Sequence, residues 1–344
     1  VGVEVAAVAA ADEDIAKQAV EMLDVHYEVL PPVFDPEEAM KPDAPQVRSE
    51  GNRREPTVIA WGDVDKGLKD SDIVAEGSIK FESQQYATIG RNACIAEWTG
   101  DRVTMWTSTQ TPSECQTAIA QAFGISINKV RVIGLPSGSS FGLWWVNNFH
   151  LITVLLAKKV RRPVKIELDQ EECFAAVKRR HLERTRGRIG CKKDGSIVFV
   201  DLEHIIDNGG YGLKSDVGFF SCDLWGRGPH GRFVVQAAST NLLTAGCMRG
   251  VGDVTLSAFT ERLLDMAAIK LAMDPLEFRL KNHLRAGEPL RKKRSGSTGY
   301  QPPSDFEDKW PPAFILSNEA LHECLTTGAE VFGWRKKWKG WGKP

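Results

Sequence analysis

The sequence has 344 residues, enough for about two domains of average size. Its 44 Lys and Arg residues and 45 Asp and Glu residues leave a formal net charge of −1, so no basic excess indicates a nucleic-acid partner. The composition, 42% hydrophobic and 26% charged, is that of a globular protein, and no apolar run reaches the roughly 18 residues that span a bilayer.

The seven cysteines are spread along the chain, and no two of them form a Cys-x-x-Cys pair. An iron–sulfur cluster or a thiolate metal site needs several cysteines at short, repeated spacings. We therefore expect no such cluster on this chain. We interpret the cysteines as reduced, mostly buried thiols of a cytoplasmic protein.

The first 31 residues have the pattern of a β-α-β element. Residues 1–8, which are rich in Val, and residues 26–30, His-Tyr-Glu-Val-Leu, predict two strands. Between them, acidic residues 12–14 can cap a helix, and apolar residues recur at helical spacing up to Leu23. Residues 32–58 are rich in Pro, Glu and Asp without periodicity, which predicts an extended linker.

From about residue 59, strands and helices alternate, which predicts an α/β fold with mixed sheets and helices. The predicted strands are residues 72–81, 93–98, 103–107, 129–134, 163–168, 184–191 and 196–204. The predicted helices are residues 112–123 and 149–159, a long helix after Gly252 and a second one from Pro275. For the long helix we expect a buried apolar stripe of Phe259, Leu263, Met266, Ile269 and Met273.

Conventional catalytic motifs do not occur. Residues 135–142 form a loop of small residues between a strand and a helix, which by itself is a weak signal of an anion site. Neither a dinucleotide fingerprint nor a P-loop is present. The triplet Arg179, Arg180 and His181 is the most polar cluster beside a strand, and it fits either a surface patch or part of a site. Residues 291–294, Arg-Lys-Lys-Arg, predict a solvated loop.

Six segments resemble one known family. Together and in this order, they are similar to the molybdenum-binding subunit of the xanthine dehydrogenase and aldehyde oxidoreductase family: residues 5–14, 35–42, 106–110, 140–142, 248–252 and 273–282. The resemblance covers nearly the whole chain. It implies that residues 1–31 end an α/β hammerhead domain, that residues 32–58 are a linker, that residues 59–332 form the first molybdopterin-binding domain, and that residues 333–344 cross over towards a second one.

The resemblance also implies a cofactor and the residues around it. The cofactor would be molybdenum bound to molybdopterin, in its plain or a dinucleotide form. Gln110 would donate a hydrogen bond to an oxo ligand, Phe141 would lie against the metal, and Arg249 would stabilise anionic oxygen, all three as neighbours of the metal and not as its ligands. The implied cofactor-binding set is Gln110, Gly138, Ser139, Ser140, Phe141, Gly142, Met248, Arg249 and Gly250, and the implied substrate pocket is Trp144, Trp145, Arg180 and Val251.

Two segments depart from the family pattern. Where the family has Gly-Gly-Gly-Phe-Gly-Gly, residues 137–143 are Ser-Gly-Ser-Ser-Phe-Gly-Leu, followed by Trp144 and Trp145. Residues 253–255 are Asp-Val-Thr where Gly, Pro and Gln are usual. The two tryptophans fit either a narrowed, ring-stacking pocket or simple packing.

The resemblance implies partners as well. The general base, a glutamate of the second molybdopterin domain that is not in these residues, would come from a separate subunit or from the rest of a cut chain. Other subunits would carry 2Fe–2S clusters and FAD. Three functions stay open at this point. They are one half of a molybdenum hydroxylase acting with water on an N-heterocycle or aldehyde, a reductase of the 4-hydroxybenzoyl-CoA reductase type, and a scaffold or assembly subunit without the cofactor.

Overall fold

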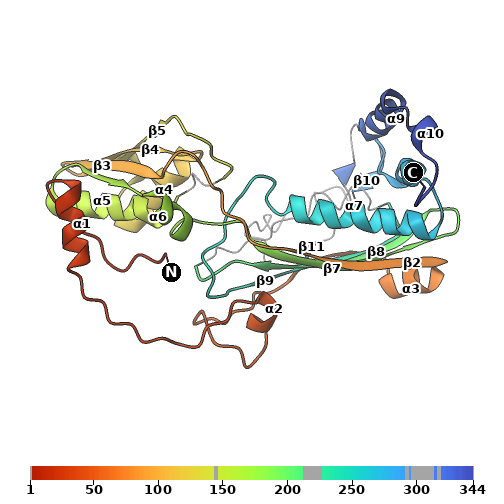
Figure 1. Ribbon diagram of the computed structural model, residues 1–344, viewed down its shortest axis with the longest axis horizontal. Helices are drawn as coiled ribbons and strands as arrows, with labels where there is room; N and C mark the ends of the chain where they lie inside the picture. Colours follow the sequence, from red (N-terminus) through yellow and green to blue (C-terminus); the bar gives the residue numbers. More distant parts are fainter. Residues whose placement is uncertain are drawn as a thin grey trace.

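Two β-sheets, each with its own helices, organise the chain (Figure 1). The computed structural model describes residues 2–142, 146–211, 227–290, 294–295, 314–315 and 319–343. The mixed α/β architecture predicted from the sequence is confirmed. In the described residues, no helix is both long and apolar enough to cross a membrane.

The smaller sheet has four strands in the order β5-β4-β3-β6. Strands β3 (Ala93–Thr99) and β4 (Arg102–Ser108) form a hairpin, β6 (Val164–Glu167) pairs antiparallel with β3, and β5 (Val130–Leu135) pairs parallel with β4. Helices α4 (Pro112–Phe123) and α5 (Asn148–Val160) cover it, and η1 (Ile127–Lys129) and α6 (Gln170–Ala175) are short connections. The core of this lobe contains the fully buried Met105, Ile119 and Val154.

The larger sheet has six strands in the order β11-β1-β9-β8-β7-β2. Their bounds are Arg294–Ser295 (β11), Thr57–Trp61 (β1), His230–Ala238 (β9), Ile197–Asp207 (β8), Leu182–Cys191 (β7) and Ile73–Phe81 (β2). Helix α7 (Asp253–Lys270) lies on one face, and the short helices α2 (Pro36–Ala39) and α3 (Val64–Asp70) lie on the other (Figure 1). The main core forms under α7, where Phe259 and Leu263 pack on Ile59 and Ile189.

The remaining elements flank these two layers. Helix α1 (Glu13–Glu21) lies beside the smaller lobe, and helices α8 (Pro275–Asn282), α9 (Leu321–Phe332) and α10 (Trp334–Lys337) gather near the C-terminal end of α7 (Figure 1). Strands β10 (Pro289–Leu290) and β12 (Phe314–Ile315) form a separate pair. Trp334 and Trp341 tie the last residues to the α7–α8 corner by donating to the Asp274 carboxylate and the Met273 carbonyl.

The two strands predicted near the N-terminus are wrong. Residues 2–8 and 26–30 are extended but pair with no strand in the described residues, and the Val29 side chain is 88% exposed. A β-strand is stable only when a neighbour takes up its backbone hydrogen bonds, which a Val-rich pattern alone cannot provide. The helix between them is confirmed as α1, capped by the Asp12 carboxylate on the Ile15 amide.

The segment predicted as an extended linker is also more structured than expected. Asp35 caps α2, Pro36 stands at the first helical position, and Ala39 is buried against the larger sheet. Arg184 of β7 forms ion pairs with Asp35 and Glu37. A local cap and long-range ion pairs thus anchor a segment that has no periodicity.

Two further predictions need correction. Helix α7 ends at Lys270 because Ala272 adopts a left-handed backbone with φ of +53°, so Met273 lies beyond the helix, and Ile269 is 44% exposed. The buried positions of α7 instead include Leu256 and Leu264. Of the basic run predicted as a loop, Arg294 belongs to strand β11, and residues 291–293 lie outside the described residues.

Candidate functional site

Strands β4 and β5 bring the first two predicted site segments to one edge of the smaller sheet. Because the strands are parallel, their carboxyl ends meet, with Ser108 opposite Leu135. The Ser108 hydroxyl donates to the Pro136 carbonyl at 3.0 Å. Gln110 follows β4 as an exposed residue directly before α4, and the loop of residues 136–142 follows β5 beside it.

That loop has an unusual backbone. The φ values are +71° at Ser139, +54° at Phe141 and +106° at Gly142. Residues other than glycine seldom adopt this left-handed backbone region. The Gly90 amide donates to the Gly138 carbonyl at 3.1 Å. A non-glycine residue persists in this region only where surrounding contacts hold it, and such strain is concentrated at binding and catalytic sites.

The third predicted segment, residues 248–252, is in direct contact with this loop. The Arg249 amide donates to the Phe141 carbonyl at 2.7 Å. A Cβ atom at Gly142 would lie 2.2 Å from the Cys247 carbonyl oxygen, so only glycine allows the two turns to approach this closely. The structure therefore unites segments that are more than a hundred residues apart in the sequence.

Two buried side chains hold residues 247–250, the segment termed the Arg249 turn below. Arg180 Nη2 donates to the Arg249 carbonyl at 2.7 Å, and the Tyr86 hydroxyl donates to the Cys247 carbonyl. Burial raises the pKa of Tyr86, which therefore remains a neutral donor. The sequence analysis missed Tyr86, because it lies between two strands and belongs to no motif.

The surface-patch interpretation of Arg179, Arg180 and His181 is wrong. All three side chains are buried, with exposures of 5%, 8% and 3%. Arg179 forms a buried ion pair with Asp207, and its backbone pairs with that of Ala245. The triplet therefore lies beneath the Arg249 turn, and contact of Arg180 with a substrate remains a prediction.

The groups at this edge suit an anionic, oxygen-rich group such as a pterin-bound metal centre. The Gln110 and Arg249 side chains are exposed, and they supply a neutral and a cationic donor. The hydroxyls of Ser140 and Thr111 are buried and have no hydrogen-bond partner among the residues that the structure describes, so each can still donate. Among the described residues, no three His, Cys, Asp or Glu side chains converge as metal ligands. Trp144 and Trp145 lie outside the described residues.

A cavity of about 1320 Å³ lies behind the Arg249 turn, and Arg179 and His181 line it, whereas none of the residues implied for the cofactor or the substrate pocket does. Lys178 and Cys247 line part of it, and Lys178 Nζ donates to the Val146 carbonyl at 2.9 Å. Burial lowers the pKa of Lys178 and raises that of the Cys247 thiol. Both shifts disfavour the charged forms, as desolvation does in general.

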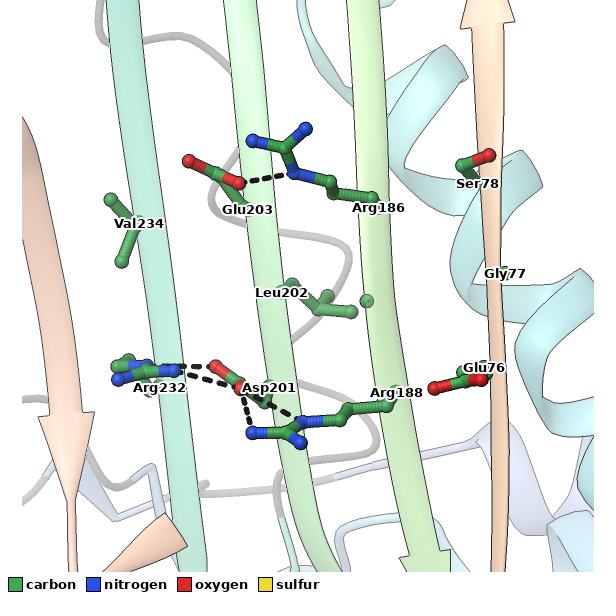
Figure 2. Close-up of a pocket in the computed structure, with 11 residues that line it drawn as sticks. Glu76, Gly77, Ser78, Arg186, Arg188, Asp201, Leu202, Glu203, Arg232 and Val234 are labelled. Carbon is green, nitrogen blue, oxygen red and sulfur yellow. Dashed lines mark hydrogen bonds and ion pairs between the residues drawn. The ribbon is translucent and has the colours of Figure 1, made fainter. Parts of the chain in front are cut away.

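A second cavity, of about 750 Å³, opens on the face of the larger sheet opposite α7 (Figure 2). Four strands present one charged row here, in which Glu76, Arg188, Asp201 and Arg232 are successive partners in the sheet register. Figure 2 shows Asp201 between the two arginines, with contacts of 2.8–3.2 Å. Since the central charges neutralise one another, we interpret this row as a stabilising, solvated sheet face and not as the site.

Comparison with known proteins identifies the family. The sequence model of the molybdopterin cofactor-binding domain matches residues 48–283. The chain belongs to the molybdopterin cofactor-binding family. It is 30% identical to the xanthine dehydrogenase molybdenum-binding subunit of Escherichia coli O157:H7 over 346 residues, which cover 98% of this chain and 43% of that protein. It is also 26% identical to the nicotinate dehydrogenase large molybdopterin subunit of Eubacterium barkeri, covering 84% of this chain and 69% of that one.

Solved structures of the molybdopterin cofactor-binding family share the fold. Quinoline 2-oxidoreductase from Pseudomonas putida 86 matches 95% of this chain with a TM-score of 0.80 and 22% identity, over 41% of its own length. Aldehyde oxidoreductase from Desulfovibrio gigas matches 95% of this chain with a TM-score of 0.78 and 20% identity, over 35% of its own length. The chain thus spans about two fifths of the length of the Escherichia coli subunit and of these two solved structures, and its resemblance to the xanthine dehydrogenase and aldehyde oxidoreductase family is confirmed.

Proposed function

We propose that the chain forms one wall of the molybdenum–molybdopterin site of a xanthine dehydrogenase-type oxidoreductase. The observation that carries the proposal is the hydrogen bond between the Arg249 amide and the Phe141 carbonyl. Through this contact the loop and the Arg249 turn form one surface, beside the edge at which Gln110 is exposed. The reaction would be hydroxylation of an N-heterocycle or an aldehyde with water as the oxygen source.

The chain's own residues would bind the cofactor and polarise the oxygen atoms that react. The cofactor, when bound, supplies the oxygen transfer and accepts the electrons. Gln110 can donate to an oxygen atom without adding charge, and the Arg249 guanidinium can stabilise negative charge that develops on oxygen. Gly138, Gly142 and Gly250 let backbone approach the cofactor closely, since none carries a Cβ atom.

Other parts of the site would come from outside these 344 residues. We assign the general base, a glutamate, to a partner that carries a second molybdopterin-binding domain, and we assign 2Fe–2S clusters and FAD to further subunits of a cytoplasmic complex. The chain covers 43% of the Escherichia coli relative and 41% of quinoline 2-oxidoreductase, which is consistent with further parts of the site on a partner or on the rest of a longer chain. In this scheme residues 1–31 end a hammerhead domain, residues 59–332 form the first molybdopterin-binding domain, and residues 333–344 lead towards the second.

The first experiment is metal and pterin analysis of the complex purified from its native source, with every co-purifying chain identified by mass spectrometry. We expect about one molybdenum and one pterin per copy, and turnover of N-heterocycles or aldehydes. Turnover of aromatic acyl-CoA thioesters instead would replace the hydroxylase proposal with a reductase. An intact complex with neither metal nor pterin would overturn both the hydroxylase and the reductase proposal, and an assembly role would remain.

Arg249→Ala tests the assignment of the turn. We expect turnover to fall by about a hundredfold or more, as happens when one donor to a developing oxyanion is removed, with the fold and the pterin content unchanged. Arg102→Ala is the matched control, because Arg102 is exposed at the opposite end of β4 from Gln110. If the Arg249 and Arg102 variants turn over at the same rate, Arg249 does not belong to the site.

A further inference from the structure

Beneath the Arg249 turn lies a buried acid that the proposed function does not use. Glu183 is 1% exposed, and among the described residues neither of its carboxylate oxygens has a partner at hydrogen-bond distance and angle, although the Thr255 hydroxyl is near enough to lower its pKa. It lies on β7, on the side of the larger sheet covered by α7, since its neighbours Arg184 and Arg186 point to the opposite, charged face. A buried carboxyl without partners is costly, so its presence calls for a role.

His204 faces this acid from the adjacent strand β8. His204 Nε2 lies 3.8 Å from a Glu183 oxygen and has no hydrogen-bond partner in the described part of the chain, while its Nδ1 is 2.7 Å from the Thr185 hydroxyl. With the ring proton on Nδ1, directed at Thr185, Nε2 is a bare acceptor aimed at the carboxyl. A small approach of the two groups makes a hydrogen bond from a protonated Glu183 to His204.

Arg180 links this pair to the Arg249 turn. Its Nη2 donates to the Arg249 carbonyl, whereas its Nε is buried with no partner. The positive guanidinium favours the ionised form of Glu183, and the Asp253 carboxylate at the start of α7 opposes it. Arg180 therefore has two competing acceptors, the Arg249 carbonyl and an ionised Glu183.

We propose that Glu183 is a positioning residue that controls the Arg249 turn by its proton. Protonated Glu183 bonds to His204 and leaves Arg180 to hold the Arg249 carbonyl. Ionised Glu183 draws the Arg180 guanidinium towards itself, which weakens the hold on the turn and with it the contact to Phe141. The catalytic consequence rests on the proposed function, whereas the effect on the turn does not.

The surroundings shift Glu183 towards its protonated form. Burial raises the pKa of Glu183, and the Thr255 hydroxyl and Arg180 only partly offset this. Burial lowers the pKa of His204 to about 4, so His204 is neutral and can accept the proton. The charged or titratable groups that face the pair are Arg180, Asp253 and, next to His204, His181.

The test measures amide hydrogen exchange of residues 247–252 in the purified complex across a pH series, corrected for intrinsic exchange. In the wild type we expect corrected exchange to rise roughly fivefold across the series as the pH increases and Glu183 loses its proton. Glu183→Gln, which mimics the protonated acid in shape, should stay protected throughout. Glu203→Gln is the control, because Glu203 is an acid of the neighbouring strand on the opposite face of the sheet, and it should follow the wild type.

Three outcomes overturn the inference: exchange in the wild type that does not change with pH, a Glu183→Gln variant with the same rise, or a Glu203→Gln variant that loses it. Should Glu183→Gln fail to fold, Arg180→Gln replaces it. Glutamine carries no charge for an ionised Glu183 to attract, so the pH-dependent rise should disappear there too.

Turnover gives the second readout. Wild-type turnover should fall with increasing pH over the range in which the exchange rises. Turnover of Glu183→Gln should stay at its maximum to higher pH. A complex that lacks molybdopterin yet shows the expected exchange pattern would refute the proposed function and leave the Glu183 inference standing. A complex that contains molybdopterin and is active, but whose turnover falls equally at high pH in the wild type and in Glu183→Gln, would refute the Glu183 inference and leave the proposed function standing.

Discussion

At the scale of single residues, the site depends on backbone positions that reject most side chains. Gly142 combines a φ of +106° with backbone atoms of Cys247 and Met248 where a Cβ would lie. Ser139 and Phe141 accept left-handed conformations without being glycine. These positions store strain that the contacts around the Arg249 turn must offset.

Gly142→Ala should therefore separate the two turns. The new methyl group meets the Cys247 carbonyl, and we expect a loss of roughly 2–4 kcal/mol in the free energy of unfolding, together with a fall in pterin content of the complex. The control is Gly100→Ala in the β3–β4 turn, where φ is +61° but nothing lies within 4 Å of the new Cβ. That variant should cost only about 1 kcal/mol. If urea unfolding shows that both variants lose the same free energy of unfolding, the close approach to Cys247 does not contribute to stability.

At the scale of elements, the larger sheet is stabilised differently on its two faces. The α7 face is a packed apolar core, whereas the other face carries the cross-strand row of Glu76, Arg188, Asp201 and Arg232 between α2 and α3. Asp201 is 12% exposed in its side chain and accepts from arginines on both neighbouring strands. Directly opposed charges of opposite sign are favourable in a sheet, and like charges are not.

Asp201→Asn should cost more than a typical surface ion pair. The substitution leaves two arginines beside each other without the charge between them, and we expect a loss of about 1–2 kcal/mol at low salt that shrinks at high salt. Glu76→Gln at the exposed end of the row should change stability by less than about 0.5 kcal/mol. Urea unfolding of both variants at two ionic strengths decides the matter. A loss for Asp201→Asn that is independent of salt would point to lost hydrogen bonds and not to charge.

The elements that the sequence predicts well are those whose pattern is local. Helix α4 has Pro at its first turn and Gly124 at its end, and strands β7 and β8 flank a clear turn, so capping and turn residues mark them. Strand β9 was not predicted, because it is held by long-range pairing with β8 and β1, which no local pattern reveals. The β-α-β prediction at the N-terminus failed for the converse reason, since Val-rich segments suit strands but need a partner.

The site itself was predictable only through family resemblance. The residue pattern alone predicted a loop of small residues after a strand, which is a weak indication of an anion-binding site. Contact between this loop and the Arg249 turn depends on how the two lobes meet, and the supporting Tyr86, Arg180 and Glu183 belong to no spacing rule. Burial of Arg180 and Glu183 was contrary to the usual exposure of charged residues.

At the scale of the whole molecule, three buried histidines in both lobes link stability to pH. Burial lowers the pKa of His150 in the smaller lobe and His204 in the larger sheet to about 4, and burial with nearby Arg179 lowers that of His181 to about 3. Their ordinary pKa is 6.5. Above that value the histidines are neutral in both the folded and the unfolded chain and cost nothing.

As the pH falls from about 6.5 to about 4, the unfolded chain takes up protons that the folded chain refuses, so stability is lost over this window. Each histidine should cost roughly 2 kcal/mol at about pH 5, while the raised pKa of Glu183 acts in the opposite sense and offsets part of the loss. Urea unfolding at a series of pH values measures the slope. His150→Gln should reduce that slope by about one proton, because Gln keeps a polar group near the Thr107 hydroxyl but does not titrate. His26→Gln, at an exposed position, should leave the slope unchanged, and an equal effect of the two variants would mean that burial does not set the pH dependence.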